Sequence, residues 1–258
     1  METKGKRLLH LGGAEFQMPA IECAKRLGCF VITADNRPEN PGHRLADLYV
    51  DVSTVDREGI LALARQHHVD GIMTFGSDVA APTVCYVAEK LGLPGNPLAA
   101  AEVLQRKDLF RAFQKAQGLP HPDFAVASTP GEARDGYGRL GGKIVVKAGD
   151  SSGSKGLSVI HSEDEAEAAF RRALGFSRCG KVVLERFLAP DMLELDGDVL
   201  VKGGRLAFRH YGHNYFARQG ESYVPCGEIF PGFFGDSVAD QLDRQLQSVI
   251  SALGIRIG

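Results

Sequence analysis

The sequence predicts an α/β protein in which a doubly wound parallel sheet is followed by an α+β region. The first hundred residues alternate short apolar runs with segments of helical periodicity, a pattern typical of parallel strands joined by crossover helices. Turn-forming residues then cluster between Gly92 and Pro97, which indicates a domain boundary. Beyond that cluster the strands come partly in neighbouring pairs. We therefore predict two domains, residues 1–97 and 98–258.

The elements of the first domain follow from two kinds of hydrophobic pattern. Apolar runs predict strands, and apolar residues every three to four positions predict helices. In chain order we expect a strand at 7–11, a helix at 19–27, strands at 30–33 and 48–52, a helix at 56–67, a strand at 71–75 and a helix at 79–91. Gly12 and Gly13 form the turn after the first strand, and Gly92 ends the last helix.

The second domain has a different order of elements. We expect a helix at 107–117, a strand at 123–127, a helix at 130–139, strands at 143–147 and 157–160, a helix at 162–174, a strand at 181–185, an antiparallel pair at 193–202 and 205–211, and a helix at 236–253. Gly203 and Gly204 supply the turn between the paired strands. We place a lid subdomain at about 120–182 and a C-terminal lobe at 183–258.

The composition is that of an ordinary globular protein. Of the 258 residues, 44% are hydrophobic and 24% are charged, with a net charge of −2. That balance gives no general attraction to nucleic acid or to an anionic membrane. The five cysteines are scattered without a C-x-x-C pair, which favours reduced thiols in the cytoplasm. No stretch has the length of a membrane span or a signal-peptide core, so we expect a soluble cytoplasmic protein.

The segment with the most informative chemistry runs from Ile144 to Ile160. A strand ends in Lys147, a loop of Gly and Ser follows, and a second strand returns. Backbone N–H groups of such a loop can surround phosphate oxygens, and Lys147 would place a positive charge on them from a rigid base. An ordinary exposed hairpin loop is the alternative. The loop is not a Walker A motif, because Ser154 stands where that motif needs glycine and a strand replaces its helix.

Three blocks of sequence, in this order, resemble the ATP-grasp superfamily. The block from Arg106 to Arg111 is similar to the family's first lysine helix. Val146-Lys147 with the loop 150–156 resembles its second lysine and glycine-rich lid, and Val183 to Leu188 resembles the segment that receives adenine. The resemblance covers almost the whole chain and is closest to proteins like the carbamoyl-phosphate synthase large chain, biotin carboxylase and carboxyaminoimidazole ribonucleotide synthase. It implies a pre-ATP-grasp domain followed by an ATP-grasp domain with an incomplete C-terminal lobe.

The resemblance implies ATP and Mg²⁺ as cofactors and gives individual residues roles. Lys107 and Lys147 would contact the phosphates, and Glu185 would accept a hydrogen bond from the adenine amino group. The other implied nucleotide contacts are Ser152, Gly153, Ser154, Gly156, Arg186, Phe187, Leu188 and Glu194. Each residue also has a plainer interpretation. Lys107 would then be a solvated surface lysine, and Glu185 would pair with Arg186 or Lys181.

The segment from Arg209 to Arg218 gathers Arg, His, Tyr and Asn around one glycine. Our hypothesis is that Arg209 or Arg218 binds an acidic substrate group or an acyl phosphate by bidentate contacts. The alternative is an edge strand with ordinary polar side chains. His210 and His213 lie three residues apart without a neighbouring acidic motif, so we predict no metal ligands here.

The implied function is that of an ATP-dependent ligase. It would join a small-molecule carboxylate to an amine through an acyl phosphate, and a homodimer is the expected assembly. ATP-grasp enzymes of this kind place their magnesium ligands on strands that follow the helix corresponding to 236–253, and this sequence stops at Gly258. We therefore expect no protein ligands for Mg²⁺ within it.

Two other functions stay open. A nucleotide-binding module or subunit without ligase activity fits the missing metal ligands. A NAD-dependent oxidoreductase is suggested by the turn Gly12-Gly13 and by Asp35 at the end of the second strand, although the G-x-G-x-x-G fingerprint is absent. In the resemblance to ATP-grasp proteins, the same loop and Asp35 instead border the second substrate.

Overall fold

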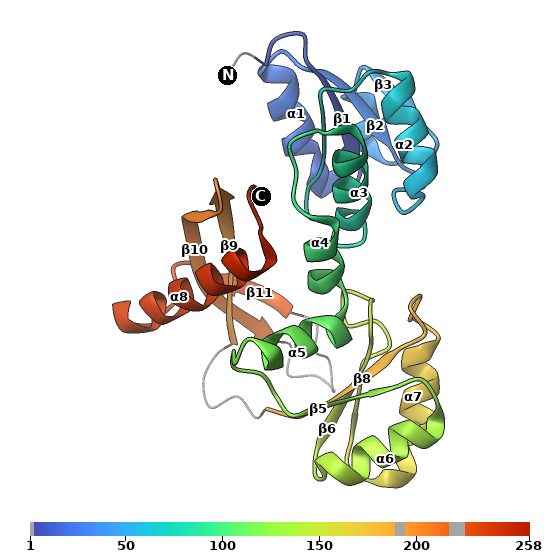
Figure 1. Cartoon of the computed structure of the whole chain (residues 1–258), viewed down its shortest axis with the longest axis vertical. Coiled ribbons are helices and arrows are strands. Elements are labelled where there is room, and N and C mark those ends of the chain that lie inside the picture. Colours follow the sequence, from blue (N-terminus) through green and yellow to red (C-terminus); the bar gives the residue numbers. More distant parts are fainter. Residues whose placement is uncertain (1–2, 189–193, 217–224) are drawn as a thin grey trace. The chain divides into compact units, whose positions relative to one another are not determined.

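The structure is a computed structural model that describes residues 3–188, 194–216 and 225–258 (Figure 1). The chain forms two compact units. The first consists of Met1–Gln105 with Leu253–Ile257, and the second of Arg106–Ala252 with Gly258. We describe each unit by itself. The predicted domains, divided at residue 97, stay a prediction.

The first unit is built on a parallel four-stranded sheet in the order β3-β2-β1-β4. Its strands are β1 (Arg7–Leu11), β2 (Phe30–Ala34), β3 (Leu48–Val50) and β4 (Gly71–Thr74), and its helices are α1 (Met18–Arg26), α2 (Arg57–Gln66), α3 (Ala81–Leu91) and α4 (Leu98–Gln105). Leu9 and Leu11 of β1 are fully buried in a cluster with side chains of α2 and α3, whereas Leu8 packs with Ile21 of α1. Helices therefore cover both faces, which confirms the predicted doubly wound sheet.

Local chemistry explains where the helices of this unit begin and end. The Asp56 carboxylate accepts a hydrogen bond of 3.0 Å from the backbone N–H of Gly59, which caps the start of α2. Gly92 closes α3 in the left-handed conformation, with φ of 65°, which a residue without a Cβ adopts at low cost. Both features agree with the sequence prediction.

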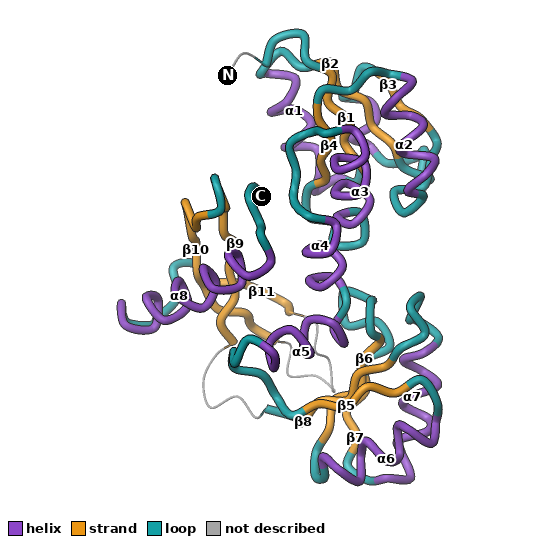
Figure 2. The backbone as a smooth tube through the Cα atoms, in the orientation of Figure 1, coloured by secondary structure: helices purple, strands orange, loops and turns teal. Residues whose placement is uncertain are grey.

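The second unit contains an antiparallel sheet in the order β5-β8-β6-β7. Its strands are β5 (Phe124–Ala127), β6 (Ile144–Ala148), β7 (Ser158–Ile160) and β8 (Val182–Arg186), and the nearby helices are α5 (Lys107–Ala116), α6 (Pro130–Leu140) and α7 (Ala166–Leu174). One face of the sheet packs against α6 and α7 around Phe170, which is 1% exposed (Figure 2). Because side chains alternate along a strand, every second residue of β6 and β8 lies on the opposite face.

The rest of the second unit is a three-stranded antiparallel sheet and a long helix. The strands are β9 (Glu194–Lys202), β10 (Arg205–Phe216) and β11 (Pro225–Ile229), in the order β11-β10-β9, and the helix is α8 (Asp236–Leu253). With one parallel and two antiparallel sheets, the predicted fold class is confirmed.

Some elements differ from the prediction. Neither α4 nor β11 was expected, β10 runs past residue 211 to Phe216, and β3 ends at Val50 instead of residue 52. All five residues of β11 are exposed, so its side chains show no alternation between buried and exposed positions. Its place in the sheet is set by backbone pairing with β10. The helix α4 begins directly after the turn cluster that ends at Pro97. The turn-forming residues there favoured a loop, so the short helix was not predicted.

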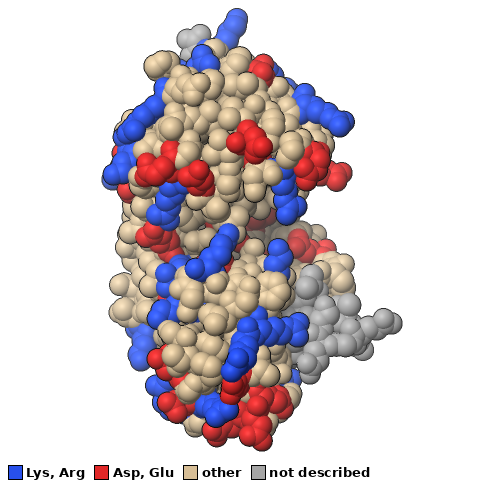
Figure 3. All heavy atoms as spheres, turned by 90° about the vertical axis from the view of Figure 1, so that its right-hand side faces the viewer, with Lys and Arg blue, Asp and Glu red and all other residues tan. Residues whose placement is uncertain are grey.

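Charged side chains of both signs are interspersed over the molecular face in Figure 3. This agrees with the near balance of 30 basic and 32 acidic residues in the sequence. Within the ranges that the structure describes, no helix combines the length and the apolar composition that crossing a bilayer requires.

Candidate functional site

Lys147 and Glu185 form an ion pair on the lid sheet. Glu185 lies opposite Val145 in the antiparallel register, and Lys147 stands two residues further along the same strand, so both side chains are on the face away from α6 and α7. The Lys147 Nζ donates a hydrogen bond of 2.6 Å to Glu185 Oε2. The carboxylate is 4% exposed and the lysine side chain 25%, so the pair is largely shielded from water.

Arg111 of α5 is a second cationic partner of the same carboxylate. Its Nε donates a hydrogen bond of 2.9 Å to Glu185 Oε1. Burial favours the neutral acid, but the charges and hydrogen bonds of Lys147 and Arg111 outweigh it, so the pKa of Glu185 lies below its usual value. The sequence had left open a pairing of Glu185 with Arg186 or Lys181. The structure corrects this.

Both alternative partners are bonded elsewhere. The Arg186 guanidinium contacts the Asp123 carboxylate at 3.3 Å and donates to the Leu140 carbonyl at 3.0 Å. The Lys181 ammonium donates to the Ser128 hydroxyl at 2.7 Å. Neither cation is therefore the partner that fixes the ionisation of the buried carboxylate.

Lys107 begins α5 next to the start of the Gly/Ser loop. Its backbone N–H donates to the Gly149 carbonyl at 2.7 Å, and its Nζ donates to the Ser151 carbonyl at 2.5 Å. The two lysines of the predicted site thus both lie at the start of the Gly/Ser loop. Lys147 lies on the strand that enters the loop, and Lys107 contacts the first residues of the loop itself.

The loop is anchored at its beginning and exposed in its middle. The Asp150 carboxylate, 7% exposed, accepts hydrogen bonds from the Arg178 backbone N–H at 2.9 Å and from the Ser177 hydroxyl at 3.2 Å. Residues 152–155, by contrast, are exposed. The backbone is left-handed at Gly153 and Ser154, with φ of 64° and 55°, so successive N–H groups change direction within a short span.

Gly156 ends the exposed part of the loop and is buried against α7. Its φ is 73°, and a Cβ there would lie 2.8 Å from the Phe176 ring and 3.2 Å from the Ala173 Cα. A side chain would therefore clash with the helix as well as strain the backbone. The residue type at this position is required by the close approach of the loop to α7.

In the predicted adenine segment, at the end of β8, part of the backbone is already hydrogen-bonded within the protein. The Arg186 N–H donates to the Asp123 carbonyl and the Phe187 N–H donates to the Lys143 carbonyl, both at 2.9 Å. Leu188 is 68% exposed. The roles of these three residues at a nucleotide base stay predictions. Glu194, predicted to lie near the ribose, accepts a hydrogen bond of 3.3 Å from the Asn214 amide.

Arg209, one of the two predicted substrate-binding arginines, lies on β10 and contacts α8. Its Nε donates to Asp243 Oδ2 at 2.6 Å, and the Tyr211 hydroxyl donates to the other oxygen of the same carboxylate at 2.8 Å. The bond to Asp243 thus gives Arg209 a partner within its own unit, and its substrate role stays a prediction. Arg218 lies outside the described residues.

The Tyr211 hydroxyl should titrate at unusually high pH. Burial, together with the hydrogen bond to Asp243 and its negative charge, raises the pKa of Tyr211 to about 12. Because that value exceeds the ~10 of an unfolded tyrosine, the associated stabilisation is present below about pH 10 and is lost as the pH rises towards 12. A pH titration followed by NMR of the tyrosine rings measures this value directly.

The variant Asp243→Asn should lower the pKa of Tyr211, because it removes the charge while keeping an amide acceptor. A Tyr211 resonance that titrates near pH 10 in the native chain, or that does not move in the variant, would contradict the proposed coupling.

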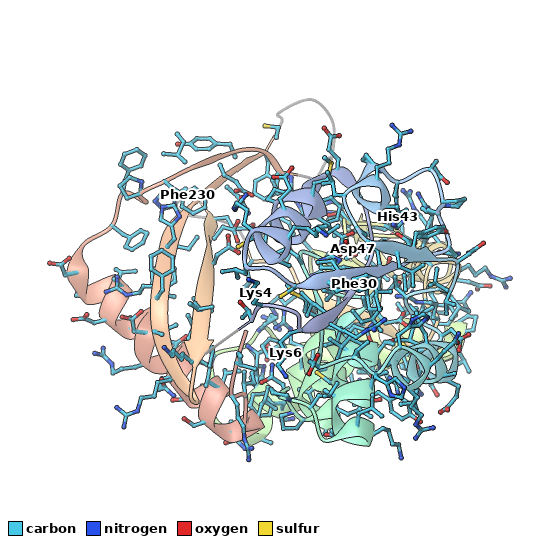
Figure 4. All side chains as sticks on the ribbon, turned by 90° about the horizontal axis from the view of Figure 1, so that it is seen from above. Lys4, Lys6, Phe30, His43, Asp47 and Phe230 are labelled. Atoms are coloured by element: carbon cyan, nitrogen blue, oxygen red, sulfur yellow. The ribbon has the colours of Figure 1, made fainter. Side chains whose placement is uncertain are left out.

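The two histidines of β10 have structural partners. The Nε2 of the buried His213 accepts a hydrogen bond of 2.9 Å from the Phe233 N–H, so its Nδ1 carries the proton and donates to the Glu194 carbonyl at 3.3 Å. The His210 ring stacks on Phe230 with 4.3 Å between centroids (Figure 4).

The described residues contain no cluster of metal-ligating side chains. Over 3–188, 194–216 and 225–258, no group of three or more His, Cys, Asp or Glu side chains is placed to hold a metal ion. Mg²⁺ beside a nucleotide is commonly held by one or two carboxylates together with waters and phosphate oxygens. The observation therefore concerns only sites built entirely from protein ligands.

The first unit carries a compact polar cluster at the carboxyl ends of its strands. The Gln17 amide donates to the carbonyls of Leu11 and Phe75, at 3.3 and 2.9 Å. His43 (Figure 4) bonds the Thr33 hydroxyl at 3.0 Å.

Sequence reasoning missed Gln17 and His43, and it missed Arg111 in the second unit. For Arg111 a signal existed, because a residue four positions after Lys107 lies on the same side of a helix.

Two close approaches explain the double glycine in this cluster. A Cβ at Gly12 would lie 2.2 Å from the Gln17 amide oxygen, and one at Gly13 would lie 2.3 Å from the His43 ring. Both positions thus need glycine for packing within the loop. The NAD alternative rested on this turn, and packing accounts for its glycines without a dinucleotide.

A separate groove of about 350 Å³ occurs in the second unit. It is lined mainly by apolar side chains of α5, β9 and α8, among them Phe110, Leu195, Val199, Leu242 and Leu246. Its lining includes none of Lys107, Lys147 and Glu185. The groove therefore does not contribute to the candidate site.

Comparison with known proteins places the fold in context. Residues 21–95 match the family described as the ATP-grasp N-terminal domain. A formate-dependent phosphoribosylglycinamide formyltransferase of Paraburkholderia xenovorans (strain LB400) is 31% identical over 193 residues, covering 73% of this chain and 48% of that protein. The first unit thus carries an ATP-grasp N-terminal domain. It spans about half the length of the curated relatives that it matches.

Solved structures agree with the ATP-grasp fold. An L-amino acid ligase from Bacillus licheniformis has a TM-score of 0.79 at 23% identity, covering 99% of this chain and 62% of that one. An N5-carboxyaminoimidazole synthetase from Staphylococcus aureus, complexed with ADP, has a TM-score of 0.76 at 17% identity, covering 97% and 64%. At these identities the likeness establishes the ATP-grasp fold alone.

Proposed function

We propose that this chain is the ATP-binding part of a ligase that joins a carboxylate to an amine through an acyl phosphate. The observation that supports it most strongly is the lid sheet of the second unit. There Lys147 lies on the strand that leads into an exposed Gly/Ser loop, and Lys107 contacts the start of that loop. The buried Glu185 lies beside Lys147. Two cations that can bind phosphates, and an anion that can accept from an amino group, thus lie beside an exposed loop, which suits a nucleoside triphosphate.

The residues present fit ATP in charge and in shape. An ammonium group has three donors on a flexible stem, so Lys147 can turn from Glu185 to a phosphate oxygen. The exposed residues 152–155 have room above them, since nothing lies within 4 Å of a Cβ built at Gly153. Closing this loop would direct backbone N–H groups at phosphate and exclude water. ATP itself supplies the phosphoryl group that activates a carboxylate.

The substrate class rests on the names of the relatives. One relative is a formate-dependent formyltransferase acting on phosphoribosylglycinamide, and a structural neighbour is an L-amino acid ligase. These names combine a small carboxylate with an amine, which is the class we propose here. The Gly12-Gly13 loop and Asp35 of the first unit stay our candidates for bordering the second substrate.

One observation favours a second function, that of a nucleotide-binding module without turnover. Among the described residues, no group of three or more His, Cys, Asp or Glu side chains is placed to hold a metal ion. Phosphoryl transfer relies on metal ions to neutralise charge between phosphates. The chain by itself would then bind ATP and leave the chemistry to residues supplied from elsewhere.

Two assays on the whole chain separate these functions. Calorimetric titration with ATP, ADP and NAD measures binding, and ADP release in the presence of Mg²⁺ measures turnover. The substrates to test for turnover are formate with phosphoribosylglycinamide, and pairs of amino acids. Turnover that needs both a carboxylate and an amine supports the ligase. ATP binding without turnover supports the module, and binding of NAD without ATP would overturn both proposals.

A further inference from the structure

We propose that Arg111 is a positioning residue of the nucleotide site, which holds the Glu185 carboxylate in place when Lys147 turns towards phosphate. The inference rests on the proposed ATP-binding function and adds to it a residue that none of the predicted contacts included. It concerns how the base-recognising acid stays ionised and oriented, not how phosphate is bound.

The geometry divides the carboxylate between two cations. Arg111 Nε donates to Oε1 of Glu185 at 2.9 Å, and Lys147 Nζ donates to Oε2 at 2.6 Å. The two cations come from different elements, α5 and β6. Glu185 itself is 3% exposed. A carboxylate buried to this degree stays charged only with cationic partners at hand.

The two cations differ in how firmly they are held. Lys147 ends in a point charge on a flexible stem, whereas the planar guanidinium of Arg111 presents donors in a fixed arrangement. A further bond fixes Arg111, because its Nη1 donates to Gln114 Oε1 at 2.5 Å, and the Gln114 amide donates to the Pro120 carbonyl at 3.0 Å. Arg111 is therefore anchored independently of Lys147.

Nucleotide binding would use these two partners differently. If Lys147 moves to a phosphate oxygen, one oxygen of Glu185 loses its donor and can accept from the 6-amino group of adenine. Arg111 then remains as the cation that keeps the carboxylate ionised and in position. Hypoxanthine carries a 6-oxo group, an acceptor that an ionised carboxylate repels. Arg111 should thus increase the preference for ADP over IDP through Glu185.

The test compares ADP and IDP binding to the full chain by calorimetry. Arg111→Gln should weaken ADP binding by roughly tenfold, the size of a lost charge-assisted hydrogen bond, and weaken IDP binding much less. Arg111→Lys retains the positive charge and should restore part of the preference for ADP. Arg134→Gln is the matched control, because Arg134 pairs with Glu167 on the lid helices, and it should leave both affinities unchanged.

Two results for Arg111→Gln would overturn the inference. Equal losses of ADP and IDP affinity would mean that Arg111 supports only the fold, and unchanged affinities would mean that it has no role. No binding of ADP by the native chain would instead overturn the proposed function, which is distinguishable because it appears without any substitution. Should Arg111→Gln fail to fold, Gln114→Ala keeps Arg111 but removes its anchor, together with the bond to the Pro120 carbonyl, and should lower the ADP preference in the same direction. An unchanged preference for ADP in Gln114→Ala would also contradict the inference.

Discussion

Replacing Lys147 with alanine should weaken ATP binding by about 1–3 kcal/mol, the range for a lost charge-assisted contact. The side chain lies at the end of β6, directly before the exposed Gly/Ser loop. No neighbouring side chain of β6 can replace its charge, since Val146 and Ala148 face the lid core. Calorimetric titration of native chain and variant with ATP measures the difference.

The control for this prediction is Lys181→Ala. Lys181 belongs to the same sheet region, but its ammonium bonds the Ser128 hydroxyl instead of Glu185. We expect its ATP affinity to match that of the native chain. The Lys147 variant retains Arg111 beside Glu185, so its fold should persist, which circular dichroism can verify. An unchanged ATP affinity in a folded Lys147→Ala variant would contradict the assignment of Lys147.

Replacing Phe170 with alanine should lower the free energy of unfolding by about 3–5 kcal/mol, the usual cost of emptying a buried aromatic site. Phe170 is 1% exposed and lies in the cluster that joins α6 and α7 to β6 and β8. Those strands carry Lys147 and Glu185 on their other face. Loss of the core should therefore also disturb the site. Urea denaturation measures the stability change.

Phe208→Ala provides the comparison, because that phenylalanine is 60% exposed and a surface position of this kind usually changes stability by less than about 0.5 kcal/mol. Similar stability losses in the two variants would show that the cluster around Phe170 is not the core of the lid.

Most of the elements could be predicted from the sequence because their patterns are local. The strand, loop and strand from Ile144 to Ile160 were recognisable from apolar runs separated by Gly and Ser, and the end of α3 from Gly92. The strand β11 was not, since its residues are exposed and its position depends on pairing with β10. Such pairing has no signature within the strand itself.

The candidate site was predicted as a set of residues, but its internal contacts were not. Lys147 and Glu185 meet because β6 and β8 pair in one register, although 38 positions separate them in sequence. Arg111 joins the pair, although it lies 74 positions before Glu185. Contacts of this range depend on how strands and helices pack, so the sequence offered only Arg186 and Lys181 as alternative partners of Glu185.

The central claim is that Lys107, Lys147 and Glu185 surround one nucleotide. A crystal structure of the chain with bound ADP tests it most directly. We predict that the ammonium groups of both lysines lie within hydrogen-bonding distance of the phosphates of a single ADP, with its adenine amino group against the Glu185 carboxylate. A nucleotide bound elsewhere, with Lys147 still on Glu185 and Lys107 still on the Ser151 carbonyl, would contradict it.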